Sequence, residues 1–279
     1  MERPLSEKEM EVIINDVVDK YGYDFSEYSK ASMMRRINYL FITDRFVSFA
    51  EMRYRIKNDE QYLPRFIECI TVSVTEMFRD PHFYRALAAD VLPVLATYPL
   101  IRIWHAGCAT GEEVYSMAIM LKEANLLHKS LLYATDISPV ALEKAINGIY
   151  SLSHMQLYSE NYINAGGKHI LSDYYHAQYE SAKLDASLRA RMVFSTHNLA
   201  MDSSFNEFQL ILCRNVLIYF DHNLQNKVFK LFDNSLERLG FLALGTKESL
   251  RFSSISQRYK QGNVKEKIWR KMKGQEDMS

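Results

Sequence analysis

The segment AGCATGEE, residues 106–113, decides the fold of this chain because it joins a short apolar run to an amphipathic stretch. Residues 101–104 predict a β-strand before it, and residues 112–124 predict a helix after it. Gly107 and Gly111 let the backbone turn tightly, and the first turn of a helix offers unpaired N–H groups to a ligand. Glycines also occur in such turns for geometry alone. The order of strand, glycine turn and helix predicts the first unit of an α/β domain.

Short apolar runs continue to alternate with amphipathic stretches after this unit, which is typical of an α/β domain with a largely parallel sheet. Residues 151–191 interrupt the pattern. This segment is rich in tyrosine and too long for a simple connection, so it predicts an inserted subdomain. Strands are expected at residues 131–135, 192–194, 209–212 and 241–244, with an edge element at 268–269, and helices are expected from residue 139 and over residues 224–239.

Residues 1–90 predict a separate all-α domain, because their apolar residues recur at helical spacing. The pattern changes near Pro93 and Pro99, so the α/β domain is expected to occupy residues 91–279. Helices of the first domain are expected around residues 12–18, 32–41, 46–56 and 62–70.

Composition narrows the classes of function. The chain has 279 residues, and Lys plus Arg and Asp plus Glu both total 34, so no overall charge points to nucleic acid. Three widely spaced cysteines without a CxxC pair argue against a disulfide framework or a zinc site. The N-terminus carries charges where a signal peptide needs an apolar core, and no window approaches ~18 uninterrupted apolar residues. We expect a cytoplasmic monomer that holds no metal and does not enter the membrane.

Charge is unevenly distributed along the chain. Between residues 30 and 57 there are seven basic residues against two acidic ones. A basic face predicts an acidic partner, although a solvated helix surface is the plainer interpretation. The basic residues are Lys30, Arg35, Arg36, Arg45, Arg53, Arg55 and Lys57.

The two glutamates after the glycine turn indicate which ligand it binds. The pyrophosphate fingerprint GxGxxG would need a glycine where Ala109 stands. Glu112 and Glu113 at the start of the helix would repel a pyrophosphate, whereas they suit a ligand with cationic groups. S-adenosylmethionine carries an ammonium and a sulfonium. We therefore expect S-adenosylmethionine rather than a dinucleotide.

Asp136 ends the second predicted strand, about one βα unit after Gly111. An acid in this position accepts hydrogen bonds from ribose hydroxyls in Rossmann-type sites. The alternative is that Asp136 caps the helix that begins near Pro139, a role for which Ser138 competes.

The segment CRNVLIYFD, residues 213–221, directly follows the predicted strand at residues 209–212. Ligand sites of parallel sheets lie at the carboxyl ends of the strands, so Arg214, Asn215 and Tyr219 should converge there. An Arg–Asn pair is hard to explain by packing, because burying unpaired polar groups is costly. For Tyr219, a core position with its hydroxyl at the surface is the alternative.

These stretches resemble the CheR-type chemoreceptor glutamate O-methyltransferases, whose motifs run approximately NxTxFFRD, AGCSTGEEPYS, a strand ending in the ribose Asp, HNL and CRNVLIYF. This sequence has SVTEMFRD at residues 73–80, AGCATGEEVYS at 106–116, Asp136, HNL at 197–199 and CRNVLIYF at 213–220, in the same order. It departs from the family pattern at four positions, none of which removes an expected charge. At one of them Ser73 replaces a longer Asn, which would shorten a polar contact near the cofactor. The departures are Ser73 for Asn, Met77 for Phe, Ala109 for Ser and Val114 for Pro.

The resemblance implies a Rossmann-like S-adenosylmethionine-dependent methyltransferase domain with a small inserted β-subdomain, preceded by an all-α domain that recognises the substrate. It implies that glutamates in acidic cytoplasmic helices of chemoreceptors are converted to methyl esters in signalling adaptation, with S-adenosylhomocysteine as product. It assigns Arg79 and Tyr219 to the reacting carboxylate as catalytic residues. Of the two glutamates after the glycine turn, it assigns one or both to the methionine end of the cofactor. The implied cofactor-binding residues are Ser73, Thr75, Arg79, Gly107, Glu112, Glu113, Asp136, Asn198, Leu199, Arg214 and Asn215.

Glutamate is already ionised at neutral pH, with an unperturbed pKa of about 4.3, so this chemistry needs no general base. The lack of an obvious His–Asp pair fits it. One alternative is an amide or small-molecule acceptor, which the missing prolines of an (N/D)PPY loop disfavour. Another is a signalling module that binds S-adenosylmethionine without catalysis. By the same resemblance, Gly166-Gly167 in the insert would help to dock a receptor tether, although a plain turn is the simpler interpretation.

Overall fold

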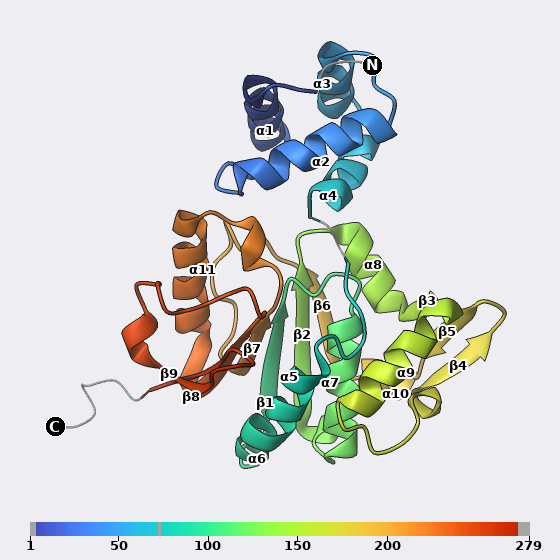
Figure 1. Ribbon diagram of the computed structural model, residues 1–279, viewed down its shortest axis with the longest axis vertical. Helices are drawn as coiled ribbons and strands as arrows, with labels where there is room; N and C mark the ends of the chain where they lie inside the picture. Colours follow the sequence, from blue (N-terminus) through green and yellow to red (C-terminus); the bar gives the residue numbers. More distant parts are fainter. Residues whose placement is uncertain (1–3, 72–73, 273–279) are drawn as a thin grey trace.

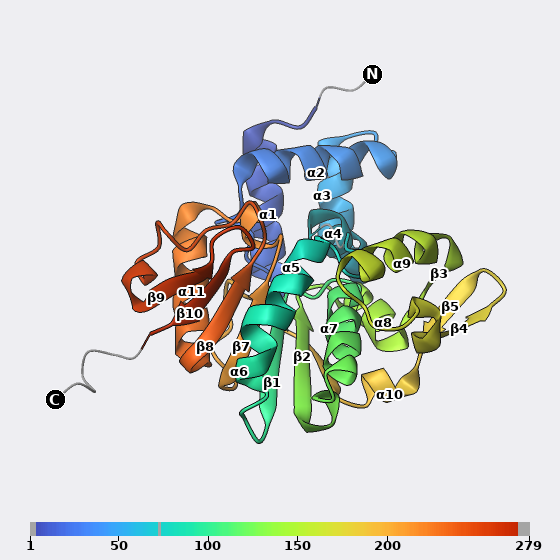
Figure 2. The ribbon, with the colours of Figure 1, turned by 60° about the horizontal axis from the view of Figure 1, so that its bottom comes forward.

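The computed structural model describes residues 4–71 and 74–272, which form a helical domain set against one side of an α/β domain (Figure 1). Figure 2 shows the same arrangement from a second direction. Within the described residues, no helix combines the length and the apolar character needed to cross a membrane.

The helical domain packs its helices around a shared apolar core, in which Phe25, Ile37 and Phe66 are fully buried. Its first helix begins with a capping box: the Ser6 side chain accepts a hydrogen bond from the Glu9 N–H, and the Glu9 carboxylate accepts one from the Ser6 N–H. The elements are α1 (Glu7–Tyr21), α2 (Lys30–Thr43), α3 (Phe49–Asn58), η1 (Glu60–Tyr62) and α4 (Leu63–Thr71).

The described part of the α/β domain contains a seven-stranded sheet in the order β6-β2-β1-β7-β8-β10-β9. The first five strands in this order are parallel to their neighbours, and β10 is antiparallel to both β8 and β9. Strand order reverses at β1, so the carboxyl ends of β1, β2 and β7 border a crevice of the kind that binds ligands. The strands are β1 (Ile101–Ala106), β2 (Ser130–Asp136), β6 (Met192–Thr196), β7 (Phe208–Cys213), β8 (Leu236–Leu244), β9 (Tyr259–Asn263) and β10 (Ile268–Lys271).

The two faces of the sheet belong to two apolar clusters, because successive residues of a strand point to opposite faces. Ile103 of β1 belongs to the cluster that contains the preceding helices and α7, whereas Trp104 belongs to the cluster that contains α11 and the helical domain. The helical elements around the sheet are α5 (Pro81–Ala86), η2 (Leu87–Val91), α6 (Leu92–Leu95), α7 (Glu112–Glu123), η3 (Leu127–Lys129), α8 (Pro139–Asn147), η6 (Leu217–Tyr219), α11 (His222–Ser235) and η7 (Ser256–Arg258).

Most predicted elements are confirmed, with two corrections. The element predicted at the sheet edge, residues 268–269, is β10, which pairs with both β8 and β9, so the edge strand is β9. The helix predicted over residues 224–239 ends at Ser235, and β8 begins at Leu236, which pairs with Phe208 of β7. The apolar periodicity of the helix continues past Ser235 in the sequence because Leu236 would be buried whether it belonged to the helix or to a strand. In addition, α5 and η2 pack in the same cluster as β1, so residues 81–91 belong structurally to the α/β domain rather than to the helical one.

The inserted segment forms a small subdomain with a three-stranded antiparallel sheet in the order β3-β5-β4, as the family resemblance implies. It lies on the side of the molecule opposite α11 and β9 in both views (Figures 1 and 2). Gly167 has to be a glycine, since a Cβ there would lie 2.2 Å from the Tyr162 ring. The elements are β3 (Ile149–Ser151), η4 (Leu152–His154), α9 (Met155–Asn164), η5 (Leu171–Tyr174), β4 (Tyr175–Gln178), β5 (Ser181–Leu184) and α10 (Ala186–Arg189).

The helical domain is joined to the α/β domain by main-chain hydrogen bonds next to the post-β7 segment. The Ser29 N–H donates to the Tyr219 carbonyl (2.8 Å), and the Asp221 N–H donates to the Glu27 carbonyl (2.9 Å). Between these two bonds, the rings of Tyr28 and Phe220 meet edge to face at 4.9 Å. The helical domain is therefore fixed at the carboxyl end of the sheet.

Candidate active site

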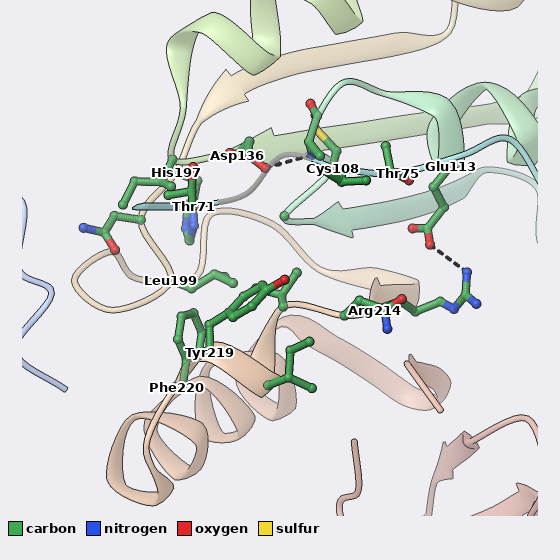
Figure 3. A pocket seen from close by; sticks show the side chains of 18 of the residues that line it. Thr71, Thr75, Cys108, Glu113, Asp136, His197, Leu199, Arg214, Tyr219 and Phe220 are labelled. Carbon is green, nitrogen blue, oxygen red and sulfur yellow. Dashed lines mark hydrogen bonds and ion pairs between the residues drawn. The ribbon is translucent and has the colours of Figure 1, made fainter. Parts of the chain in front are cut away.

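A cavity of about 200 Å³ opens at the carboxyl ends of β1, β2 and β7. Segments from both domains and from the connection between them contribute to its wall. In Figure 3, Tyr219 and Leu199 face Asp136 and Cys108 across the cavity, and Glu113 and Arg214 lie at one end. The lining residues are Tyr28, Thr71, Val74, Thr75, Glu76, Arg79, Gly107, Cys108, Ala109, Glu113, Asp136, Ile137, His197, Asn198, Leu199, Arg214, Asn215, Val216, Ile218, Tyr219 and Phe220.

The glycine turn is built for close approach on two sides. Gly107 has φ of 78°, and a Cβ there would lie 2.5 Å from Cγ2 of Val216. Gly111 has φ of 94°, and a Cβ there would lie 2.8 Å from Cβ of Ala145 in α8. Only Gly107 lines the cavity. Gly111 is thus explained by packing, as the geometric alternative proposed, whereas Gly107 serves both the packing and the cavity.

Asp136 is buried and bound to the glycine turn. Its Oδ2 accepts a hydrogen bond from the Ala109 N–H (2.8 Å), and its Oδ1 accepts one from the Ser138 N–H (2.9 Å). Burial raises the pKa of Asp136, and these main-chain donors oppose the shift. The Ser138 hydroxyl, not Asp136, caps α8 by accepting from the Ala141 N–H. Asp136 is therefore free of the capping role, and its oxygens keep lone pairs for a ligand.

Arg214 lies buried at one end of the cavity between two acids. It contacts Glu113 Oε2 at 3.1 Å and Asp80 Oδ2 at 2.7 Å, and its guanidinium lies 3.9 Å from the ring centroid of Phe83. Glu113 Oε1 lies 2.9 Å from Nδ1 of His105. Burial pushes the pKa of Glu113 upward, but His105 and Arg214 outweigh it and leave that pKa below its ordinary value. From the sequence, a buried arginine after β7 was hard to explain by packing. In the structure, its charge is neutralised by Asp80 and Glu113.

Glu112 departs from its predicted place. Its side chain is buried outside the cavity lining and accepts a hydrogen bond from the Thr110 hydroxyl (2.6 Å). Burial raises its pKa to about 7. Successive residues on a helix point about 100° apart, so one of two adjacent glutamates faces the cavity and the other does not. Glu113 faces it.

The other predicted site residues stand as follows. Thr75, Arg79, Asn198, Leu199, Asn215 and Tyr219 all line the cavity, as do Gly107, Glu113, Asp136 and Arg214. The Asn198 side chain also accepts a hydrogen bond from the Ala200 N–H (3.0 Å). Ser73 lies outside the described residues.

Three residues of the helical domain contribute to the cavity and were not predicted as site residues: Tyr28 and Thr71 line it, and Arg36 packs on Tyr219, which lines it. Tyr28 lines the cavity on the side of Asp136, and nothing in its sequence surroundings distinguishes it. Arg36 is 6% exposed and holds its guanidinium 4.3 Å from the ring centroid of Tyr219. Its spacing from Met33 and Leu40 places it on the buried side of α2, a signal that periodicity could have supplied.

The predicted basic face is corrected accordingly, because Arg36 is buried. Four others are neutralised within the domain: Arg53 and Lys57 by Asp16, Lys30 by Glu7 and Glu11, and Arg55 by Asp59. Arg35 and Arg45 are exposed, and no described acidic residue forms an ion pair with either. Arg35 shares one face of α2 with the exposed Tyr39 and Ile42, because the three recur at helical spacing, and Arg45 follows the end of the helix.

Comparison with known proteins gives matches over nearly the whole chain. Residues 73–268 match the family described as CheR methyltransferase, SAM binding domain, and residues 8–71 match CheR methyltransferase, all-alpha domain. A Pseudomonas putida protein with the provisional name methyltransferase Cher3 is 44% identical over 263 residues, covering 94% of this chain and 96% of that protein. A chemotaxis protein methyltransferase of Listeria monocytogenes is 31% identical, covering 82% and 85%. One of Borreliella burgdorferi is 31% identical, covering 88% and 90%.

Proposed function

Because the chain belongs to the CheR methyltransferase family, we propose that it methylates the side-chain carboxylate of glutamates in a protein, foremost the cytoplasmic helices of chemoreceptors. Its class is established by the family: it is an S-adenosylmethionine-dependent methyltransferase. The proposal of a glutamate carboxylate as acceptor rests on the composition of the cavity. A cationic residue, Arg79, and a tyrosine, Tyr219, line the same space as the residues suited to the cofactor.

The cavity residues fit S-adenosylmethionine. Asp136 offers carboxylate oxygens for ribose hydroxyls at the end of β2, and Ile137 and Leu199 offer apolar surface for an adenine ring. Glu113 stands at the end of the cavity where the methionine part would lie. When bound, S-adenosylmethionine supplies an electrophilic methyl group on a positively charged sulfur.

The acceptor needs no activation by a base. A glutamate carboxylate with a pKa of about 4.3 is ionised at neutral pH. One of its oxygens forms the new O–CH₃ bond as the S–CH₃ bond breaks, the electron pair stays on sulfur, and no proton moves. The protein has to hold the oxygen in line with that bond, about 3–3.5 Å from the methyl carbon. Positioning, rather than acid–base chemistry, is what these residues contribute.

Arg79 and Tyr219 are suited to that positioning. Arg79 is half-buried at the cavity, and its carbonyl accepts a hydrogen bond from Arg214 (3.3 Å), which fixes its backbone. Its guanidinium would attract and orient the acidic side chain, while the Tyr219 hydroxyl contacts the second carboxylate oxygen. A tight two-point clamp by the arginine would stabilise the ground state and slow the reaction, so the hold has to be partial.

The substrate surface we propose is smaller than the sequence indicated. Arg35 and Arg45, with the exposed Tyr39 and Ile42, form a strip along α2 that suits an acidic amphipathic helix. The same helix, α2, also provides Arg36, whose guanidinium packs on the ring of Tyr219 in the cavity wall, so the proposed strip lies on a helix that contacts the cavity. We place the reaction in the cytoplasm, where such receptor helices lie. The required packing of Gly167 on Tyr162 favours a plain turn over tether docking in the insert.

Two measurements on the full chain test the proposal. S-adenosylhomocysteine is titrated into the purified protein by calorimetry, and transfer of labelled methyl is then assayed on acidic receptor fragments. Base-labile label on fragments with glutamate, and none on fragments whose sites are changed to glutamine, supports the ester. Binding without transfer to any acidic helix would favour a non-catalytic module, and base-stable label would favour an amide acceptor.

A further inference from the structure

We propose that Glu248 is a positioning residue that holds the segment after β7 in the shape the cavity needs. Glu248 lies 33 residues beyond Asn215 in the sequence, follows β8, and is not among the cavity-lining residues. The effect of Glu248 on cofactor binding does not depend on which acceptor is methylated. Its effect through Tyr219 on the acceptor rests on the function proposed above.

The carboxylate of Glu248 is the centre of a ring of main-chain donors. Its Oε1 accepts hydrogen bonds from the N–H groups of Val216 (2.9 Å) and Leu217 (2.7 Å). Its Oε2 accepts from those of Asn215 (3.1 Å) and Gly245 (2.6 Å). The residue is 5% exposed. In the described part of the chain, the hydrogen bonds that the Glu248 carboxylate accepts come from backbone N–H groups, so its charge is balanced by main-chain dipoles rather than by a side-chain cation.

Three consecutive N–H groups can converge on one anion only when the backbone bends sharply. Asn215 supplies the bend, with φ of 62°, a conformation unusual for a residue other than glycine. If the carboxylate were removed, these buried N–H groups would have no partner, which is costly. The segment would then relax toward a conformation that satisfies them. Glu248 therefore maintains the strained conformation of Asn215.

The held segment meets the cavity at both of its ends. Val216 packs against the glycine turn so closely that Gly107 has no room for a Cβ. At the next residue η6 begins, and it brings Tyr219 to the cavity wall. A relaxation of this segment would therefore disturb the cofactor turn and Tyr219 together.

Gly245 supports the same interpretation from the other strand. A Cβ at Gly245 would lie 2.8 Å from both the Asn215 nitrogen and Glu248 Oε2. The end of β8 is thus shaped to let the carboxylate reach the segment after β7. The two neighbouring parallel strands, β7 and β8, are coupled at their carboxyl ends by this one side chain.

The test compares Glu248→Gln with a matched control, Asp233→Asn. Asp233 is another buried carboxylate of the same domain, 2% exposed, whose partners are Arg258, Lys271 and Tyr259 rather than the cavity. Both substitutions keep the side-chain shape and remove a buried charge, so both are expected to lower the melting temperature. Glu248→Gln should also weaken S-adenosylhomocysteine binding about tenfold and slow methyl transfer about 10–100-fold. Asp233→Asn should leave both within about twofold.

Hydrogen exchange and a second variant complete the experiment. In Glu248→Gln, the amides of residues 215–217 should lose protection while those of β7 keep it. Glu248→Asp retains the charge on a shorter stem and should fall between wild type and Glu248→Gln in cofactor affinity. Wild-type affinity and protection in both Glu248 variants would overturn the proposal, and so would an equal loss of affinity in Asp233→Asn. Cofactor affinity needs no acceptor, so a failure to find a methylated protein leaves this test intact.

Discussion

The guanidinium of Arg36 lies over the ring of Tyr219, with 4.3 Å between Arg36 Cζ and the ring centroid. Arg36 belongs to α2 of the helical domain and also donates to the carbonyl of Ile70 at the end of α4. Tyr219 belongs to η6 of the α/β domain and lines the cavity. A residue proposed to orient the acceptor is therefore held in place by the other domain.

Loss of this stacking should slow the reaction. Arg36→Met keeps much of the volume but removes a cation–π contact of about 1–2 kcal/mol, so we expect turnover to fall about tenfold. Affinity for S-adenosylhomocysteine should change little, because Arg36 does not line the cavity. The control for single-turnover rates with saturating acceptor is Arg55→Met, which removes a similar cation–π contact, with Tyr62, away from the cavity. A lower melting temperature with unchanged turnover in Arg36→Met would contradict the role.

Charge reversal of the strip on α2 should weaken substrate recognition. The double variant Arg35→Glu with Arg45→Glu should raise the KM for an acidic receptor fragment by about tenfold at low salt, and less at high salt, because exposed charges are screened. The control is the double lysine variant, which keeps both charges. Identical kinetics for the glutamate and lysine variants at physiological salt would remove the strip from recognition.

A methyl group at Gly107 should disrupt the cofactor end of the cavity. Gly107→Ala brings a Cβ within 2.5 Å of Val216 and should weaken S-adenosylhomocysteine binding at least about tenfold. Gly22→Ala is the matched control: Gly22 has a similar φ of 74°, and a Cβ there meets nothing within 4 Å. It should lose about 1 kcal/mol of stability from backbone strain and bind the ligand normally. Equal affinity in the two variants would show that the contact with Val216 is unimportant.

Glu112 should make the stability of the fold depend on pH. Burial raises its pKa from 4.5 to about 7, so the folded protein holds this proton more tightly than the unfolded chain. The resulting stabilisation is complete below pH 4.5 and is lost as pH rises through 7. Glu112→Gln, which stays neutral, should be more stable than wild type by about 1–3 kcal/mol at pH 8, and the difference should shrink to about a quarter of that at pH 5. Urea unfolding at the two pH values measures this, and a difference that does not vary with pH would contradict it.

Arg79 should act on the acceptor more than on the cofactor. Arg79→Ala is expected to lower kcat/KM for the receptor fragment about 100-fold, because an ionised acceptor loses its orienting charge. Calorimetric affinity for S-adenosylhomocysteine should stay within about threefold. Arg79→Lys keeps the charge and should recover part of the rate. A collapse of cofactor binding in Arg79→Ala would assign the residue to the cofactor instead.

The local parts of this site could be predicted from the sequence, and the parts that depend on distant segments could not. The turn at residues 106–113 and Asp136 were found because strand, turn and helix are neighbours in the chain. The ion pairs of Arg214 join residues about 100 and 134 positions apart, so its neutralisation was invisible. Glu248 looks like an ordinary surface glutamate until the sheet brings β7 and β8 together.

The apolar cluster that runs from Phe25 and Ile37 of the helical domain to Trp104 and Leu242 of the sheet has a consequence for how this protein unfolds. Neither domain can open without exposing the core of the other. The two halves should therefore melt in one cooperative step. If the two domains were expressed separately, each would expose the apolar surface that it buries against the other and would tend to aggregate.

The shared core also limits how the helical domain can evolve, because it cannot be replaced by another domain without changes in the α/β domain. Its inner surface has to change together with the catalytic half, and only its outer helix surface can change independently.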